Sequence, residues 1–447
     1  MKKKLTGLLL VASTVLGMGA LTACDGKKEA STRVQKAIAD AETLSHDELF
    51  KKAAEELGET GQLKIAATTS RGGKTTVTDL FKAELQKHNS KITNPIKYDT
   101  FVDGAIYTTL IGEIINGKKD GYSGTITQDG YQLQKKAIDK GYFENYIPKT
   151  WREAQGADLS AKDPFTLQYN FKTWMYNNKN KDMVIDNVWD VTHSKYKGKI
   201  DTMDPNNENV NMDWLIQLTS DEEVAKLKAA FEDSTATTDV NIDNYQQFGD
   251  KKYAYAFIDR FLSNAVFYAD DGKAMTHLAQ TPGNIGWIVY SKLLKVEESN
   301  DISKKNIVVA ALGENNTDGA KMDKSCIKGF GGFMYKHYLQ VLKDAQYPYA
   351  TCAFFELIST NAKAYSVWGG DVGDYPSLPS INVDRTKNGV DKEIADGTKV
   401  NMSCLNDPTS TWWLGKGAAV VETPSFIGAH YDDVIDFIDV VIAAKAK

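Results

Sequence analysis

A run of small polar residues followed by an arginine and two glycines is the segment of this sequence best suited to hold an anion. Residues 68–73 read TTSRGG and follow a short apolar run, and helical spacing resumes at Thr75. Hydroxyls, a guanidinium and free backbone amides at the start of a helix suit carboxylate, phosphate or phosphonate groups. We therefore take Thr69, Ser70 and Arg71 as candidate binding residues. The alternative is an ordinary strand-to-helix loop with a surface arginine.

The remaining reactive side chains predict neither catalysis nor a metal site. The letters GGKT at 72–75 imitate the end of a nucleotide-binding P-loop, but that pattern requires glycine where Thr68 stands. The six histidines are far apart and form no HxH, HxxxH or His/Cys cluster. The hydrolase motifs GxSxG and HExxH are absent from the sequence. We expect no enzymatic activity, no metal and no cofactor.

Length and composition predict a globular chain of two lobes. The 447 residues are 42% hydrophobic and 25% charged, which excludes collagen, coiled-coil, disordered and polytopic membrane classes. One hydrophobic core seldom serves so long a chain, so we expect two lobes with a core each. The formal charge of −6 makes nucleic acid an unfavourable partner.

The first 24 residues have the order of an export signal. Three lysines at 2–4 precede an uncharged stretch that ends with LTAC at 21–24. This ending resembles the bacterial lipobox, so residues 1–23 are predicted to be a lipoprotein signal peptide and Cys24 the lipidated first residue of the mature chain. Two acyl chains on one residue suffice for stable anchoring. A single transmembrane anchor is the alternative, which the polar and glycine residues of the stretch disfavour.

Hydrophobic periodicity predicts strands that alternate with helices. A capping box at Ser45–Glu48 begins the first helix, which should end near Gly58. Strands and helices then alternate at 63–68, 75–87, 96–101, 105–116, 124–127 and 132–140. An aromatic run at 165–176 predicts a long strand between the lobes. Later strands are expected at 199–203, 253–258, 285–290 and 307–311, and helices at 349–360 and 431–445. This alternation indicates mostly parallel sheets.

Several short motifs occur in an order that is typical of one protein family. They are SHDELFKKAAEELGETGQLKIAA at 45–67, LIGEIING at 110–117, GYF at 141–143, YIP at 146–148, VWD at 188–190, YKGKI at 196–200, DP at 204–205, YPYA at 347–350 and FFELI at 354–358. Together they resemble the extracellular solute-binding proteins of ABC importers, in the bilobal group that binds ferric iron, thiamine, polyamines, phosphonates and related solutes. The resemblance spans most of residues 45–360.

The resemblance implies an α/β fold of the periplasmic-binding-protein type (type II). Two lobes, each with a central mostly parallel sheet flanked by helices, would be joined by crossover strands. The implied boundaries are 24–44 for a lipid-anchored tether, 45–165 with about 330–420 for lobe 1, and 166–329 with the C-terminal helix at about 421–447 for lobe 2. The crossover at 165–176 and the glycine-rich return at 327–333 are the implied hinge.

In such a fold the ligand lies between the lobes, at the carboxyl ends of strands and the starts of helices. The residues then expected at the ligand are Thr69, Ser70, Arg71, Gln128, Asp129, Asp204, Asn206, Asp259, Arg260, Trp368, Asp371 and Tyr375.

Three of these assignments have structural alternatives. Asp204 and Asn206 precede an expected helix and could simply form an Asx turn. Asp259 and Arg260 end an expected strand and could be a structural ion pair. Trp368 could stack on a sugar, cover a cationic amine or merely pack a loop.

The function implied by the resemblance is capture of a small solute by closure of two lobes, and its delivery to an ABC permease and its ATPase. We expect a monomer held by lipid on the outer face of a bacterial cell membrane. Arg71 favours an anionic or phosphorylated solute, whereas the aromatic content and acidic charge also allow a carbohydrate or a cation. Iron is disfavoured because the ferric subgroup typically uses adjacent tyrosines and none are adjacent here. The alternative function is an exported glycan-active enzyme or a glycan-binding surface lipoprotein.

Overall fold

The computed structural model describes residues 32–102, 104–157, 159–179, 183–293, 306–313, 323–369, 373–381, 391–393, 399–401 and 410–445. The predicted signal peptide and Cys24 lie outside these residues. Among the helices that are described, none is both long and apolar enough to span a bilayer.

One twelve-stranded sheet forms the centre of the molecule, in the order β2-β1-β3-β10-β5-β8-β6-β7, with β4 and β14 beside β10 and β9 and β11 beside β5. Its strands are β1 Leu63–Ala67, β2 Ile96–Thr100, β3 Gly124–Thr127, β4 Phe143–Asn145, β5 Thr166–Asn177, β6 Ile200–Met203, β7 Ala265–Tyr268, β8 Ile285–Val289, β9 Ile307–Val309, β10 Gly332–Leu342, β11 Asp374–Pro376 and β14 Val420–Val421. A separate ribbon pairs β12 Asp391–Glu393 with β13 Lys399–Asn401.

Pairing is parallel within β2-β1-β3 and within β8-β6-β7. It is antiparallel where β10 and β5 connect these two groups. The two sheets expected from the sequence are therefore hydrogen-bonded into one.

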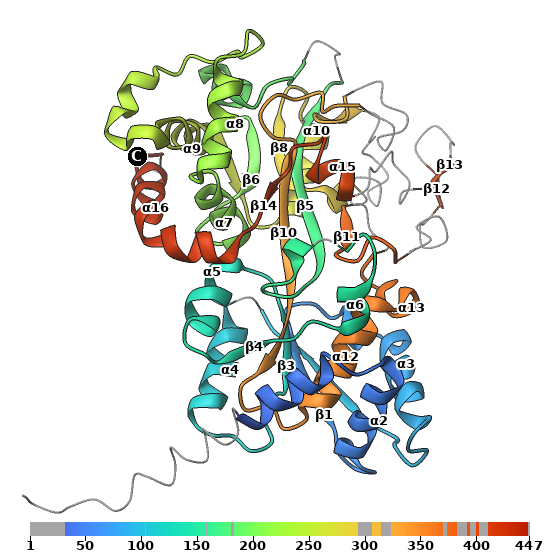
Figure 1. The fold of residues 1–447 in the computed structure, drawn as a ribbon. Coiled ribbons are helices and arrows are strands. Elements are labelled where there is room, and N and C mark those ends of the chain that lie inside the picture. The colour runs from blue at the N-terminus through green and yellow to red at the C-terminus, as the bar shows by residue number, and fades with distance from the viewer. Residues whose placement is uncertain are drawn as a thin grey trace, which may run out of the picture.

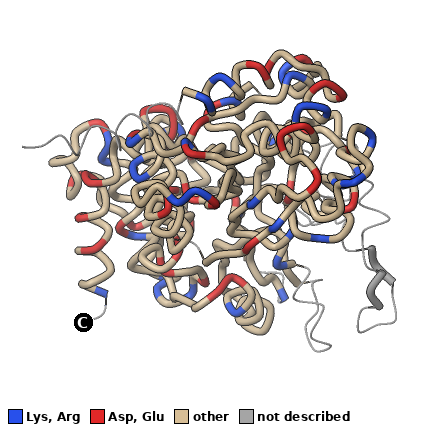
Figure 2. Tube along the Cα trace, turned by 90° about the horizontal axis from the view of Figure 1, so that it is seen from below, with Lys and Arg blue, Asp and Glu red and all other residues tan. Residues whose placement is uncertain are grey.

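Helices surround the two ends of this sheet (Figure 1). The first half is the β2-β1-β3 end with α2 His46–Leu57, α3 Thr75–Gln86, α4 Ala105–Ile115, α5 Gly130–Gln132, α6 Lys149–Glu153, α12 Pro348–Thr360 and α13 Ala362–Tyr365. The second half is the β8-β6-β7 end with α7 Asn209–Gln217, α8 Asp221–Phe231, α9 Lys252–Asn264, α10 Asp271–Gln280, α15 Ser410–Leu414 and α16 Pro424–Lys445. Acidic and basic residues are interspersed along the chain (Figure 2).

The first helix shows how local sequence determines an element here. Ser45 accepts a hydrogen bond from the Glu48 amide while the Glu48 carboxylate accepts one from Ser45, which is the predicted capping box. The apolar face of α2 is buried, and the helix packs on α12. At Gly58 the backbone has φ of +61°, a left-handed conformation that favours glycine and ends the helix.

The long strands β5 and β10 connect the halves, as Figure 1 shows. The register pairs Gly332 with Thr173 and His337 with Gln168 in the middle of the sheet. Beyond this overlap, the end of β10 pairs with β3 of the first half, and the end of β5 pairs with β8 of the second. This confirms the strand predicted at 165–176.

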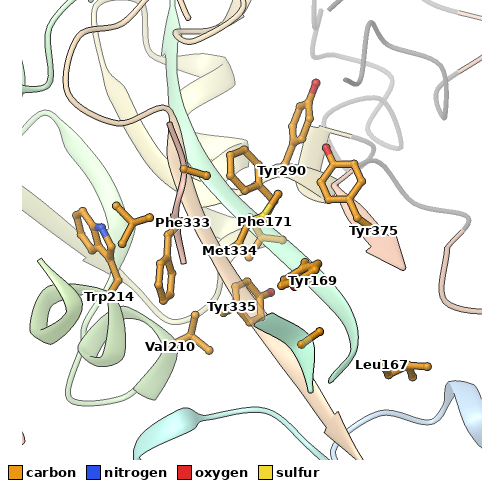
Figure 3. Packing of buried hydrophobic residues seen from close by; sticks show 14 of the residues in the cluster. Leu167, Tyr169, Phe171, Val210, Trp214, Tyr290, Phe333, Met334, Tyr335 and Tyr375 are labelled. Carbon is orange, nitrogen blue, oxygen red and sulfur yellow. The ribbon is translucent and has the colours of Figure 1, made fainter. Parts of the chain in front are cut away.

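Buried residues of one hydrophobic cluster cover both faces of this strand pair (Figure 3). On one side Phe333 points toward Val210 and Trp214 of α7. On the other side Phe171 and Met334 lie with Tyr290 and Tyr375. The largest aromatic cluster of the second half surrounds Trp174 of β5, whose ring centroid lies 4.5 Å from that of Trp287. Further rings of this cluster belong to Trp214, Phe257, Phe261 and Phe330.

Residues 253–258 form part of helix α9, so the prediction of a strand there is wrong. Aromatic residues alternate with alanine in YAYAF at 253–257, a spacing that a strand also shows. The buried residues Ala254, Phe257, Ile258, Phe261 and Leu262 instead follow helical spacing, which places one face of α9 on the core.

The prediction of a tether over 24–44 is also wrong for residues 32–41. Residues 32–41 form a helix. Its apolar positions Val34, Ala37, Ile38 and Ala41 have helical spacing and are buried. Because this helix packs on the body, it is not part of a tether. The lobe boundaries remain a prediction.

We predict that Trp174→Ala lowers the free energy of unfolding by about 3–5 kcal/mol, because it removes the ring at the centre of the aromatic cluster and leaves a cavity. Val440, which is 68% exposed on α16, provides the control. Val440→Ala should change stability by less than about 0.5 kcal/mol. Urea unfolding followed by fluorescence measures both, and equal losses would contradict the assignment of Trp174 to the core.

Candidate functional site

The loop after β1 places Arg71 beside Asp374 of β11. Gly72 lies against the ring of Tyr98, where a Cβ atom would approach Cε2 to 2.4 Å. The Tyr98 hydroxyl donates to the carbonyl of Thr69 at 2.8 Å, and the Thr69 hydroxyl accepts from the Arg71 amide at 3.3 Å. These contacts fix the loop, while the side chain of Ser70 is exposed.

Arg71 is paired with a carboxylate from a distant part of the chain. Its guanidinium donates to Asp374 Oδ2 at 2.6 Å and to the carbonyl of Trp368 at 3.0 Å. Asp374 lies on β11 and is 2% exposed, whereas the Arg71 side chain is 27% exposed. The positive charge expected to attract an anion is therefore compensated within the protein.

The predicted aromatic residues near this pair are buried. Trp368 is fully buried and stacks beside Tyr365 with a centroid separation of 6.5 Å. Of its predicted roles, packing fits this position, since the ring has no exposed face. The Tyr375 hydroxyl accepts a hydrogen bond from Trp413 Nε1 at 2.7 Å. Asp371 lies outside the described residues.

Gln128 and Asp129 follow β3, as predicted. Asp129 adopts φ of +85° and caps α5, with Oδ1 accepting from the Gln132 amide at 3.0 Å. Its Oδ2 accepts from Gln132 Nε2 at 2.6 Å and from Asn209 Nδ2 at 2.5 Å. Because Asn209 begins α7, this last bond joins the first half to the second.

Gln128 belongs to a buried polar network that the sequence did not reveal. Its Oε1 accepts from His337 Nε2 at 3.0 Å, while His337 Nδ1 accepts from Gln168 Nε2 at 2.8 Å. The Tyr365 hydroxyl donates to Gln168 Oε1 at 3.1 Å. Burial and the Arg71 charge lower the pKa of His337 to about 3, so the ring is neutral at physiological pH. This network fixes the tautomer of His337 and the orientation of Gln128.

The structure does not bring all of the predicted residues of the second half to Arg71 and Gln128. Asp204 Oδ1 accepts from the Asn206 amide at 2.9 Å, which is the Asx turn given as the alternative. Arg260 on α9 pairs with Asp239 at 2.9 Å, and Asp259 accepts from the Tyr245 hydroxyl. These partners all belong to the second half, and the expectation that Asp259 and Arg260 end a strand is corrected by α9.

A buried lysine with two carboxylates is a further feature that the sequence did not reveal. Lys172 of β5 is fully buried, and its Nζ lies 2.5 Å from Glu208 Oε2 and 3.4 Å from Asp271 Oδ1. Asn211 Oδ1 accepts from the same Nζ at 3.0 Å. Burial raises the pKa of Glu208 to about 7 despite the lysine charge. The available signal was a lysine in the otherwise aromatic run FTLQYNFKTWMY.

The site therefore contains two sets of paired charges, Arg71 with one carboxylate and Lys172 with two. Arg71 and Asp374 lie toward the first half, and Lys172 with its carboxylates lies toward the second. Among the His, Cys, Asp and Glu residues that the structure describes, no group of three or more is arranged to hold a metal ion. The Arg71–Asp374 pair has no net charge, and its Arg71 side chain is 27% exposed, whereas Lys172 is fully buried and donates to Glu208, Asn211 and Asp271.

Comparison with solved structures identifies the architecture. Iron-bound HitA from Pseudomonas aeruginosa aligns with a TM-score of 0.53 at 12% identity, over 85% of this chain and 99% of that chain. Apo FutA2 from Synechocystis aligns with a TM-score of 0.54 at 11% identity, over 85% and 98%. An ABC transporter structure from Clostridium perfringens aligns with a TM-score of 0.52 at 11% identity, over 85% and 99%.

No protein-family model and no curated protein sequence matches the chain. At 11–12% identity, the structural likeness shows the fold alone. The chain has the bilobal α/β fold of the periplasmic-binding-protein type, which confirms the fold class predicted from the sequence.

We predict that Lys172→Met lowers the free energy of unfolding by about 3–5 kcal/mol at pH 8, because two carboxylates lose their buried partner. Without the lysine, the pKa of Glu208 rises further above its unfolded-state value. The remaining stability is then greatest at low pH and falls as pH rises. The loss should therefore be smaller at pH 5 than at pH 8 in denaturant titrations.

Two further variants test this interpretation. Lys228 is 53% exposed and lies 4.0 Å from Glu232, so Lys228→Met should cost less than about 1 kcal/mol at either pH. Adding Glu208→Gln to Lys172→Met should restore part of the lost stability. A pH-independent loss in Lys172→Met would show that packing, not charge, is its cause.

Proposed function

We propose that this chain is the solute-binding component of an ABC importer. The observation that supports the proposal is the arrangement of two α/β halves on the shared strands β5 and β10, with loops of both halves in contact through Asp129 and Asn209. Bending of such strands opens and closes the halves around a small molecule, and a permease would recognise the closed form. This role requires no catalysis, so we propose a binding protein rather than an enzyme.

The proposed solute is a small, uncharged molecule rich in hydroxyl groups, of the carbohydrate class. An anionic or phosphorylated solute at Arg71 would lie beside Asp374, whose carboxylate is 2.6 Å from the guanidinium. Repulsion from that carboxylate weakens anion binding. Paired charges still donate and accept hydrogen bonds, which suits hydroxyl groups.

We also propose that the mature chain is held on the outer face of a bacterial cell membrane by lipid on Cys24. The sequence at 21–24 supports this proposal. The proposed partners are the permease and ATPase of the transporter and no nucleic acid, with the chain acting as a monomer.

A thermal-shift screen tests the function on residues 25–447, which contain all described helices and strands. The panel contains neutral sugars, sugar phosphates, phosphonates, polyamines and ferric citrate. A shift that grows with the concentration of one class supports the receptor. A response to phosphates or ferric citrate alone would overturn the proposed solute class. No response to any class, together with hydrolysis of a glycan, would favour the exported glycan-active enzyme instead.

We predict that Arg71→Ala weakens binding of the solute found in that screen about tenfold, since one charged hydrogen bond is worth about 1.5 kcal/mol. Arg260→Ala is the matched control, because it removes an Arg–Asp pair of similar length away from the site. Isothermal titration calorimetry should show unchanged affinity for the control. Equal affinity in the wild type and Arg71→Ala would remove Arg71 from the site.

We predict that Cys24→Ser prevents retention of the chain at the cell membrane, because the thiol that accepts the lipid is lost. Cell fractionation and metabolic labelling with a fatty acid measure this. Cys326→Ser, which changes an exposed thiol, is the control and should remain in the membrane fraction. Labelling of the Cys24→Ser variant would contradict the proposed anchor.

A further inference from the structure

Three buried carboxyl groups from distant parts of the chain meet where the first half contacts the second. Asp129 precedes α5, Asp213 lies on α7, and Glu422 follows β14. Their exposed fractions are 1%, 0% and 0%. Helix α5 also packs on α16, where the rings of Tyr131 and Tyr431 stack with centroids 3.4 Å apart. We call the contact of α5 with these carboxyl groups the carboxyl latch.

The geometry of the carboxyl latch forces two like-charged groups together. The Gly130 amide donates to Asp213 Oδ2 at 2.8 Å and to Glu422 Oε1 at 3.3 Å. The Tyr131 amide also donates to Asp213 Oδ2, at 3.4 Å. One N–H group shared by two carboxyl groups brings their oxygens close, and two buried negative charges so placed repel strongly.

The three carboxyl groups differ in how many of their oxygens accept a hydrogen bond. Glu422 Oε2 accepts from the Tyr338 hydroxyl at 2.5 Å and from the Lys336 amide at 3.0 Å. Both oxygens of Asp129 also have donors. Asp213 Oδ1, by contrast, is buried and has no donor within hydrogen-bonding distance. An ionised carboxylate with such an oxygen is costly, whereas a protonated Asp213 can donate to Glu422, whose Oε1 accepts from the same Gly130 amide as Asp213 Oδ2.

We propose that Asp213 shares a proton with Glu422 when α5 is docked on α7, so that the carboxyl latch holds the two halves together in a proton-dependent manner. The carboxyl latch is a property of the protein without solute and does not depend on the proposed function.

The direction of the pH dependence follows from burial. Burial raises the pKa of Asp213 well above its ordinary value, and the charges of Asp129 and Glu422 raise it further. Burial also raises the pKa of Glu422 and raises that of Asp129 to about 7. When α5 is undocked and hydrated, such carboxyl groups titrate near pH 4. The docked form therefore binds more protons, is favoured most below pH 4, and is weakened as pH rises toward and beyond 7.

The other titratable groups that face the carboxyl latch do not reverse this direction. They are Tyr107 of α4, Tyr131 of α5, Lys336 and Tyr338 of β10, and Tyr431, Asp432 and Asp439 of α16. Burial raises the pKa of Tyr131 and Tyr338, and that of Tyr431 to about 12, so these phenols stay neutral. The Lys336 charge lowers the pKa of Glu422 and so directs the shared proton toward Asp213.

Amide hydrogen exchange at Gly130 and Tyr131 in residues 25–447 tests the carboxyl latch, after correction for the intrinsic pH dependence of exchange. For each proton released, the docking equilibrium should weaken about tenfold per pH unit between pH 5 and 8. Asp213→Asn is the decisive variant, because its amide accepts from both N–H groups and donates to Glu422 as the protonated acid does. We expect Asp213→Asn to stay protected across this range and Asp213→Ala to lose protection throughout.

Asp243→Asn is the matched control, since Asp243 is an exposed carboxylate of the second half. It should follow the wild type, and small-angle scattering should show a radius of gyration that rises with pH in both but not in Asp213→Asn. Protection that is independent of pH in the wild type overturns the proposal. So does an Asp213→Asn variant that loses protection at the same pH as the wild type.

Discussion

The antiparallel pairing of β5 with β10 is the constraint on which the rest of the structure depends. Every residue of β10 is buried, and so are all but one of β5. Since both strands extend into both halves, the halves cannot separate without breaking a continuous sheet, and relative motion is restricted to bending or twisting of these two strands. Gly332 allows their closest approach, because a Cβ atom there would lie 2.2 Å from the ring of Phe171.

This constraint also explains the polar chemistry in the middle of the sheet. Paired residues of an antiparallel ladder point to the same face, so Gln168 and His337 lie together, as do Lys172 and Phe333. Polar groups in a buried strand require partners from outside the sheet. Glu208 and Asp271, at the starts of α7 and α10, supply them to Lys172. The second half is therefore positioned on β5 by charge as well as by the Trp174 cluster.

The sequence was informative where structure depends on neighbouring residues. Periodicity and capping predicted the elements from α2 to β3 to within about two residues, and the long aromatic run predicted β5. It failed at α9, where alternating aromatics concealed a helical apolar face. It also failed at residues 32–41, where a polar composition concealed four buried positions. In both cases burial against another element, not local propensity, decided the outcome.

Only part of the candidate site could be predicted from the sequence, for the same reason. The loops after β1 and β3 could be located because a strand end is a local feature. The partners of Arg71 and Lys172 could not, since Asp374 is 303 residues from Arg71 and Asp271 is 99 residues from Lys172. Charge compensation at the site is a tertiary property. Arg71 alone therefore suggested an anion, whereas the Arg71–Asp374 pair favours a solute without net charge.

Opposite charges and like charges lie at different kinds of contact in this protein. Opposite charges, such as Lys172 with Glu208, lie where the chain is joined permanently through β5. Like charges, Asp213 and Glu422, lie where α5 of the first half touches α7 and the segment after β14. A buried ion pair is costly to separate, so it suits a joint that never opens. Both residues belong to the second half, so the contact that opens is the one they make with the Gly130 and Tyr131 amides of α5. Because the two carboxyl groups are buried stably only with a proton between them, this contact is weak enough to open without unfolding either half.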